Sequence, residues 1–203
     1  MNRIIVFALM FFCMTMQIEA QTLSEEEVTA KMYQAFELNK AAKKAEALEL
    51  FLIVGENTKQ QRNEGERQVY VCSQTMACQC YELLGRYKEG YLLGKSLLQG
   101  KLNDTERKDV GHLYAMNGYM YACEFIQSDE KGRADYKRGR VLISEILPYS
   151  DGQVKEYAET KIPLSWYFEG AQYAMTQSYD EALSSYEEAL NGFRDLGRVS
   201  EEV

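Results

Sequence analysis

The sequence predicts an all-α protein, a right-handed α-solenoid of about four antiparallel helical hairpins. Residues 163–196 have the pattern of one complete helical hairpin, and weaker copies of that pattern lie upstream. Small residues recur where two helices would cross. The 203-residue chain has only two prolines and is rich in residues that favour helices. Together these observations predict consecutive amphipathic helices that bury their apolar faces against their neighbours.

The hairpin at residues 163–196 shows the pattern most clearly. Gly170, Ala182 and Ala189 would let two antiparallel helices approach closely. Large aromatic side chains are expected to fill the space around them: Trp166, Tyr173, Tyr179 and Tyr186.

The upstream copies appear when the second helices are aligned on their opening turns. In each turn an aromatic residue is followed three positions later by Gly or Ala. The aligned pairs are Tyr87 and Gly90, Tyr136 and Gly139, and Tyr179 and Ala182. First helices repeat a small residue followed by Tyr, with pairs at Cys78 and Tyr81, Gly118 and Tyr121, and Gly170 and Tyr173. We therefore expect hairpins at approximately residues 25–56, 71–100, 108–147 and 154–196.

This pattern resembles the tetratricopeptide repeat (TPR), most specifically over residues 163–196. The copies are spaced by roughly 40–50 residues rather than the ~34 of the standard repeat. The helices are therefore expected to be longer, or the loops to carry insertions. The resemblance implies a superhelix that presents its first helices on a concave surface.

Local signals set the expected helix ends. Capping boxes are expected at Ser24 with Glu27 and at Ser178 with Glu181. Gly85 and Gly100 lie where helices should stop. Pro163 either kinks a long helix or begins a new one.

The first 20 residues resemble a secretory signal peptide, with Arg3, an apolar run over residues 4–16 and a cleavage site after Ala20. The run of about 13 apolar residues is short for a span, which needs ~20. A lipid anchor at Cys13 is the rival interpretation, but the preceding Phe12 is not the small residue that such sites usually carry. We expect an exported, periplasmic protein whose helical repeat domain covers residues 21–203.

The net charge of −8 makes the chain acidic. Nucleic acids and anionic membranes favour basic patches, so neither is expected as a partner. No second apolar run of spanning length follows the first 20 residues, so no stable membrane span is expected in this chain.

Four cysteines follow the expected cleavage site: Cys72, Cys78, Cys80 and Cys123. Export makes disulfides possible, and Cys80 with Cys123 is the one pairing that neighbouring first helices would allow. The preferred interpretation makes all four buried small apolar residues.

No catalytic motif is present, and neither a metal nor a cofactor is expected. His112 is the only histidine, so no second one can complete a zinc site. The chain is not expected to be an enzyme. The one titratable pair to inspect for catalysis is His112 with Glu82, which neighbouring first helices could bring together, but both are expected to be ordinary surface residues.

The candidate binding residues are the family's concave-surface positions, carried onto the aligned first helices. They are Met32, Phe36, Thr75, Gln79, Glu82, His112, Tyr119, Cys123, Tyr167, Ala171 and Met175. This mixture suits a peptide or helix from a protein partner. It contains no Lys or Arg, whereas chaperone-binding members of the family use such residues to bind a C-terminal carboxylate.

The expected function is therefore that of a non-catalytic, exported scaffold that binds a segment of another protein. The chain also resembles the sensory N-terminal region of tetratricopeptide-containing bacterial regulators, which would give it a role in signal transduction. No full polar cap follows the last hairpin, so its apolar face is expected to be exposed or covered by something else. The alternatives are a receptor for a small ligand, either a glycan or a peptide, and an enzyme.

Overall fold

The computed structural model describes residues 23–127 and 134–197, and all regular structure within these ranges is helical. The α-helices are α2 (Glu25–Lys40), α3 (Lys44–Thr58), α4 (Glu64–Leu83), α5 (Tyr87–Leu98), α6 (Asp104–Ile126), α7 (Tyr136–Ile146), α8 (Gly152–Met175) and α9 (Tyr179–Asp195). A short 3₁₀ helix, η1 (Leu147–Tyr149), lies between α7 and α8. The prediction of an all-α protein is confirmed for these residues.

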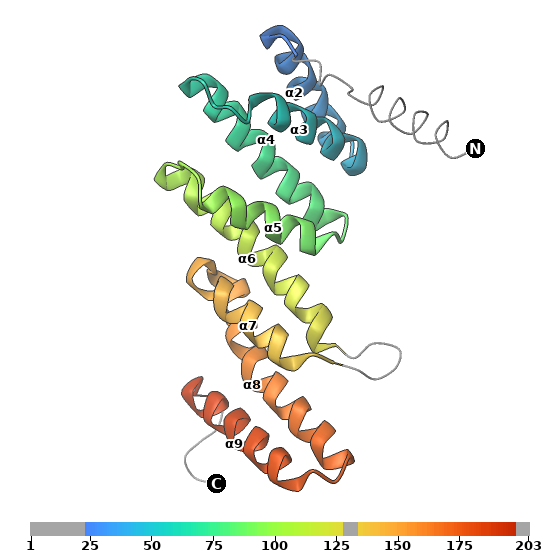
Figure 1. Ribbon diagram of the computed structural model, residues 1–203, viewed down its shortest axis with the longest axis vertical. Coiled ribbons are helices and arrows are strands. Elements are labelled where there is room, and N and C mark those ends of the chain that lie inside the picture. The colour runs from blue at the N-terminus through green and yellow to red at the C-terminus, as the bar shows by residue number, and fades with distance from the viewer. Residues whose placement is uncertain (1–22, 128–133, 198–203) are drawn as a thin grey trace, which may run out of the picture.

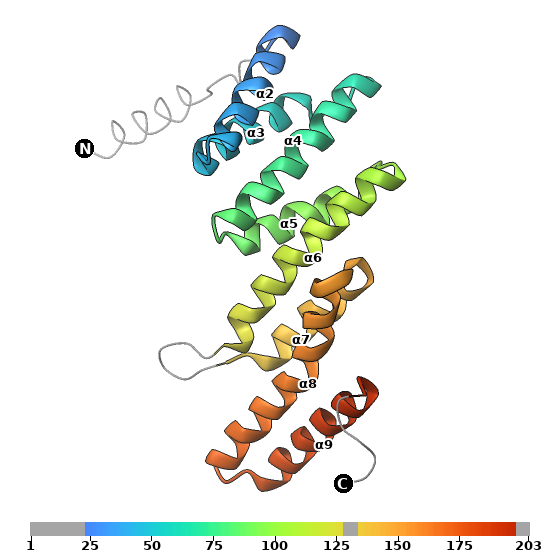
Figure 2. The ribbon, with the colours of Figure 1, turned by 180° about the vertical axis from the view of Figure 1, so that it is seen from behind.

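The helices pack consecutively along an elongated molecule, with α2 near one end and α9 at the other (Figures 1 and 2). Each helix contacts the next one in the chain. Helix α4 also contacts α6, and α6 contacts α8. The core is therefore a line of small clusters between neighbouring helices.

The alignment of the second helices agrees with the structure, because α5, α7 and α9 begin at Tyr87, Tyr136 and Tyr179. The capping box of Ser24 with Glu27 is confirmed. The one expected at Ser178 is wrong. Ser178 has φ −85° and ψ 71°, outside the extended conformation from which an N-cap hydroxyl reaches the first turn.

Close helix crossings occur at the small residues. A Cβ atom on Gly118 would lie 2.5 Å from Ile146 Cγ2, and one on Gly170 would lie 2.9 Å from the Tyr186 ring. Helix α8 continues through Pro163, so the interpretation that a new helix begins there is wrong. Pro163 is buried and packs where Gly192 of α9 leaves room.

Two aromatic positions of the repeat are not core positions. Tyr81 and Tyr121 are buried as expected. Tyr173 and Tyr179 are 36% and 68% exposed, because no described helix covers that part of the last helix pair. The assignment of these two tyrosines to packing is therefore corrected.

The expected signal peptide, residues 1–20, lies outside the described residues. Among the helices that the structure describes, none is long and apolar enough to cross a membrane.

Candidate functional site

A groove of about 1010 Å³ lies across α7, α8 and α9. Helix α8 forms its floor with Ile162, Trp166, Glu169 and Tyr173. Helix α7 contributes Lys137, Arg140, Val141 and Ser144, and α9 contributes Asp180, Glu181, Ser184 and Ser185. The helical spacing of Trp166, Glu169 and Tyr173 puts these three side chains on one face of α8.

Arg140 is the central charged group of this groove and is 9% exposed. Its Nη2 donates to Glu169 Oε2 at 2.7 Å, and its Nη1 donates to Ser165 Oγ at 3.3 Å. Its guanidinium carbon also lies 3.4 Å from the centre of the Trp166 ring. Pairing with a carboxylate and stacking on an aromatic ring allow an arginine to be buried. The pair joins α7 to α8.

The corresponding space between α5 and α7 is bridged by side chains of the protein itself. Lys95 Nζ lies 2.5 Å from Glu145 Oε1, and Tyr91 donates a hydrogen bond to Glu145 Oε2 at 2.8 Å. Tyr114 donates to Glu145 Oε1 at 3.1 Å. These bonds, above all the one from Lys95, lower the pKa of Glu145. Lys95 thus links α5 directly to α7.

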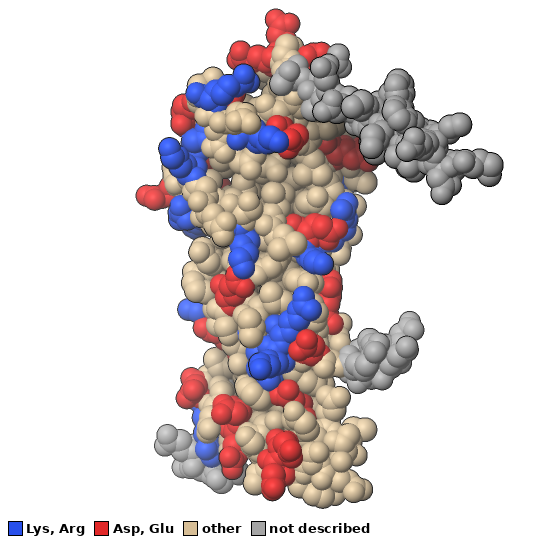
Figure 3. All heavy atoms as spheres, viewed as in Figure 1, with Lys and Arg blue, Asp and Glu red and all other residues tan. Residues whose placement is uncertain are grey.

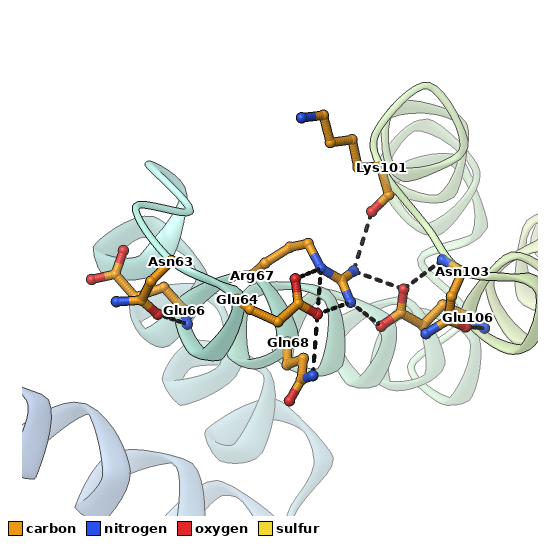
Figure 4. A network of polar contacts seen from close by, with 8 residues as sticks. All are labelled: Asn63, Glu64, Glu66, Arg67, Gln68, Lys101, Asn103 and Glu106. Atoms are coloured by element: carbon orange, nitrogen blue, oxygen red, sulfur yellow. Dashed lines mark hydrogen bonds and ion pairs between the residues drawn. The ribbon is translucent and has the colours of Figure 1, made fainter.

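A second ionic network joins the starts of α4 and α6 (Figure 4). Arg67 bonds Glu64 at 2.7 Å and Glu106 at 2.8 Å, and its Nη1 also donates to the carbonyl oxygen of Lys101 at 3.2 Å. Hydrogen bonds from Arg67 lower the pKa of both carboxyl groups. Every side-chain nitrogen of Arg67 donates to a protein group, so this arginine fixes the helix packing rather than offering donors to a ligand.

The last helix pair carries two apolar stripes of exposed and partly exposed residues, which we call the terminal face. On α8 the stripe consists of Leu164, Phe168, Ala171 and Met175, and on α9 of Tyr179, Leu183, Tyr186 and Leu190. Both stripes follow the spacing of one helix face. Phe168 is 42% exposed, Met175 86% and Leu183 59%. In Figure 3, uncharged surface lies at the lower right of this end of the molecule, beside acidic side chains.

Three of the candidate binding residues belong to this last helix pair. Ala171 and Met175 lie in the α8 stripe of the terminal face. Tyr167 is beside it, 49% exposed, with its ring centre 5.7 Å from that of Tyr186. Tyr167 is therefore shared between packing against α9 and the exposed surface.

Met32 and Phe36 line an apolar cavity of about 250 Å³ at the other end of the molecule, where Tyr33 of α2 and Val69 of α4 also contribute. Phe36 packs edge-on against Phe51, with ring centres 5.5 Å apart. Tyr33 is 70% exposed, and the alignment of first helices did not select it.

Thr75, Gln79, Glu82 and His112 do not form one cluster. The Thr75 hydroxyl donates to the Val71 carbonyl of its own helix at 2.7 Å, and Gln79 is exposed. Burial raises the pKa of Glu82, and the charge of His112 opposes that effect. These two residues are thus close enough to interact electrostatically, which the packing of neighbouring first helices allows. The ring Nδ1 of His112, however, lies 3.1 Å from Asp151 Oδ1.

Tyr119 and Cys123 lie together on α6, facing α8. The Tyr119 ring stacks on Tyr157 of α8 with centres 6.3 Å apart. Burial raises the pKa of Tyr119 and of Cys123, and Lys161 opposes the effect on Cys123. Cys123 is buried, so it is a packing residue rather than an exposed binding residue. Tyr157 is 52% exposed and was not among the predicted residues.

All four described cysteines are free thiols, so Cys80 and Cys123 do not form a disulfide in this structure. Cys78, Cys80 and Cys123 are buried, as expected for small apolar residues. The same expectation is wrong for Cys72, which is exposed.

The sequence did not predict the groove across α7, α8 and α9. Its floor lies on the face of α8 that bears Trp166 and Tyr173, which the repeat pattern assigns to packing. The sequence feature that could have indicated this groove is Glu169, an acidic residue between those two aromatic residues on one helix face.

Within residues 23–127 and 134–197, no group of three or more His, Cys, Asp or Glu side chains is placed to hold a metal ion. In comparisons with known proteins, no protein-family model, curated protein or solved structure matches the chain.

Proposed function

We propose that this protein is a non-catalytic, tetratricopeptide-like α-solenoid that binds a helical segment of another protein. The proposal includes the export to the periplasm and the role in signal transduction that the sequence resemblance implies. The observation that carries it is the terminal face on α8 and α9, which exposes residues whose counterparts in earlier helix pairs are covered.

The counterparts are defined by the aligned starts of the second helices. Tyr136 of α7 is 8% exposed and belongs to a core cluster with Val154 and Ala158 of α8. Tyr179, at the same position of α9, is 68% exposed. Burial of an aromatic side chain is worth about 1.5–3 kcal/mol, so a helix that covers Tyr179 would gain substantial binding energy.

The next aligned position, four residues further on, behaves in the same way. Tyr91 of α5 is buried and stacks on Tyr114 of α6, with ring centres 5.3 Å apart. Arg140 of α7 bonds Glu169 of α8. Leu183 of α9 is 59% exposed. In the earlier pairs this position contacts the first helix of the following pair, which supports an amphipathic helix as the occupant of the terminal face.

Receptors for small ligands usually enclose them in a cavity of a few hundred cubic ångströms that buries most of their surface. The groove of about 1010 Å³ is open and extends over three helices. Its shape favours a polypeptide segment over a small ligand.

Site-specific photo-cross-linking in the native host tests the proposal. A photoreactive residue at Leu183 should form an adduct with a helical segment of one partner protein, mapped by mass spectrometry. Leu92 of α5 is the matched control, because it is also a leucine of a second helix and is 51% exposed. If position 183 gives no more adduct than position 92, the terminal face is not the binding surface.

A further inference from the structure

We propose that the groove across α7, α8 and α9 binds a lysine or arginine side chain from a basic segment of a partner protein. This site is separate from the terminal face, and the inference does not depend on the helix proposed to bind there. It rests on the charges lining the groove and on the corresponding space between α5 and α7.

The charge of Arg140 is already balanced by Glu169 at 2.7 Å, and its ring contact is with Trp166. Among the described residues, Lys137 on α7 and Asp180 and Glu181 on α9 have no ion-pair partner. Figure 3 shows basic side chains over α7 and acidic ones over α9. The unpaired charges that line the groove are therefore two carboxylates opposed by one ammonium, and the acidic wall is the one that attracts a cation.

The floor suits the rest of a basic side chain. Trp166 and Tyr173 offer aromatic surface beside the carboxylates of α9, and such surfaces attract ammonium and guanidinium groups. Ile162 and the 59% exposed Val141 offer apolar surface. Long basic side chains lay their methylene groups on surfaces of this kind while the charged end contacts acidic groups.

The corresponding space between α5 and α7 contains such a cation from the protein itself. Lys95 Nζ lies 5.6 Å from the centre of the Tyr91 ring and 2.5 Å from Glu145 Oε1. Lys95 stands eight residues after the aligned Tyr87. The residue eight positions after Tyr136 is Ser144, which lines the groove.

Two other members of this arrangement also have counterparts of the same kind. Tyr114 lies four residues before Gly118, and Trp166 lies four residues before the aligned Gly170. Glu188 of α9 stands at the position of Glu145 of α7, but it is not among the residues that line the groove. One helix pair later, the aromatic position of the first helix and the acidic position of the second are thus retained, Arg140 stands at the position of Tyr91, and the bridging lysine is replaced by serine. A partner's cation would occupy the place of the missing lysine.

Trp166 is the only tryptophan in the chain, so its fluorescence reports directly on this groove. The purified protein is titrated with tetralysine, with tetra-arginine and with tetraglutamate at low ionic strength. We expect a saturable change with the two basic peptides, weakened by added salt, and none with tetraglutamate. An equal response to tetraglutamate, or no saturable response to either basic peptide, would overturn the inference.

Ser144→Lys is the decisive variant, because the protein's own chain then supplies a lysine at the position that corresponds to Lys95. Ser144 is exposed, so the variant should keep its helical circular dichroism and its melting temperature. We expect it to weaken binding of the basic peptides about tenfold. Asp180→Asn with Glu181→Gln should weaken binding at least about threefold.

Glu187→Gln is the control, because it removes one exposed negative charge from α9 at a residue that is not among those lining the groove. It should leave peptide affinity unchanged. If Ser144→Lys binds the basic peptides as well as the native protein does, the place of the missing lysine is not the binding site and the inference fails. This result would leave the cross-linking test at Leu183 unaffected, so the two proposals can fail separately.

Discussion

Replacing Gly118 with alanine should destabilise the protein. The added Cβ would lie 2.5 Å from Ile146 Cγ2 and 3.1 Å from the Tyr91 ring. Ile146 is fully buried and β-branched, so it has little freedom to move aside. Overpacking of this kind costs about 1–3 kcal/mol, and the better helix propensity of alanine returns about 0.5–1 kcal/mol. We expect a net loss of about 1–2 kcal/mol.

Gly111→Ala is the matched control, because Gly111 is also buried in α6. Its added Cβ would lie 3.4 Å from the Tyr149 ring, an ordinary contact distance. This variant should be up to about 1 kcal/mol more stable than the native protein. Comparing the two variants cancels the propensity of alanine in α6 and leaves the overpacking at Gly118.

Urea unfolding followed by circular dichroism measures the free energy of unfolding of both variants. The difference between them should be about 2 kcal/mol, which corresponds to about 4–8 °C in melting temperature for a chain of this size. If Gly118→Ala proved as stable as Gly111→Ala, α6 would not pack against α5 and α7 as closely as described, and the reasoning would be refuted.

Three further predictions concern charges and thiols. Hydrogen bonds from Arg67 lower the pKa of Glu106, so this stabilisation is present above the unfolded-state pKa of about 4.3 and is lost as the pH falls through the lower folded value. Arg67→Met should therefore flatten the acid limb of unfolding free energy against pH. Arg140→Ala should cost about 3 kcal/mol, because it leaves Glu169 half-buried without its partner, and the double variant Arg140→Met with Glu169→Leu should recover much of that loss in urea unfolding. In the folded protein, a thiol reagent should modify Cys72 much faster than the three buried described cysteines, as peptide mass spectrometry would show.

The cysteine prediction has a clear physical basis. Burial raises the pKa of Cys78 to about 12, so at neutral pH almost no reactive thiolate is present. The reagent also cannot reach a buried sulfur in the native state. Equal rates at Cys72 and Cys78 would contradict the packing of α4 against α5.

The start of each second helix could be predicted because the signal is local. An aromatic residue followed three positions later by Gly or Ala marks the first turn, and α5, α7 and α9 begin at that aromatic residue. The capping box at Ser24 was also predictable, since both partners lie within four residues. Ser178 has the same residue pattern, but the tight turn from α8 holds it at ψ 71°. That backbone angle depends on how two helices meet.

The groove could not be predicted because each wall comes from a different helix. The sequence assigned Trp166 to packing, and this is half correct, since one side of its ring contacts Arg140 at 3.4 Å. The other contributors, including Asp180 and Glu181, were interpretable as favourable charges in the first turn of a helix. Their position opposite Lys137 follows only from the packing of α7 and α9 on α8.

The same position of the repeat therefore has different roles along the molecule. Tyr136 and Tyr179 begin equivalent helices, yet Tyr136 is 8% exposed and Tyr179 is 68% exposed. The difference arises from the surroundings, because Tyr136 belongs to a core cluster shared with α6 and α8, whereas no described helix follows α9. A repeat pattern specifies which side chains can be buried by a following helix. The pattern does not specify whether that helix belongs to the same chain or to a partner. For the surface around Tyr179, the cross-linking experiment at the neighbouring Leu183 tests whether a partner supplies the helix.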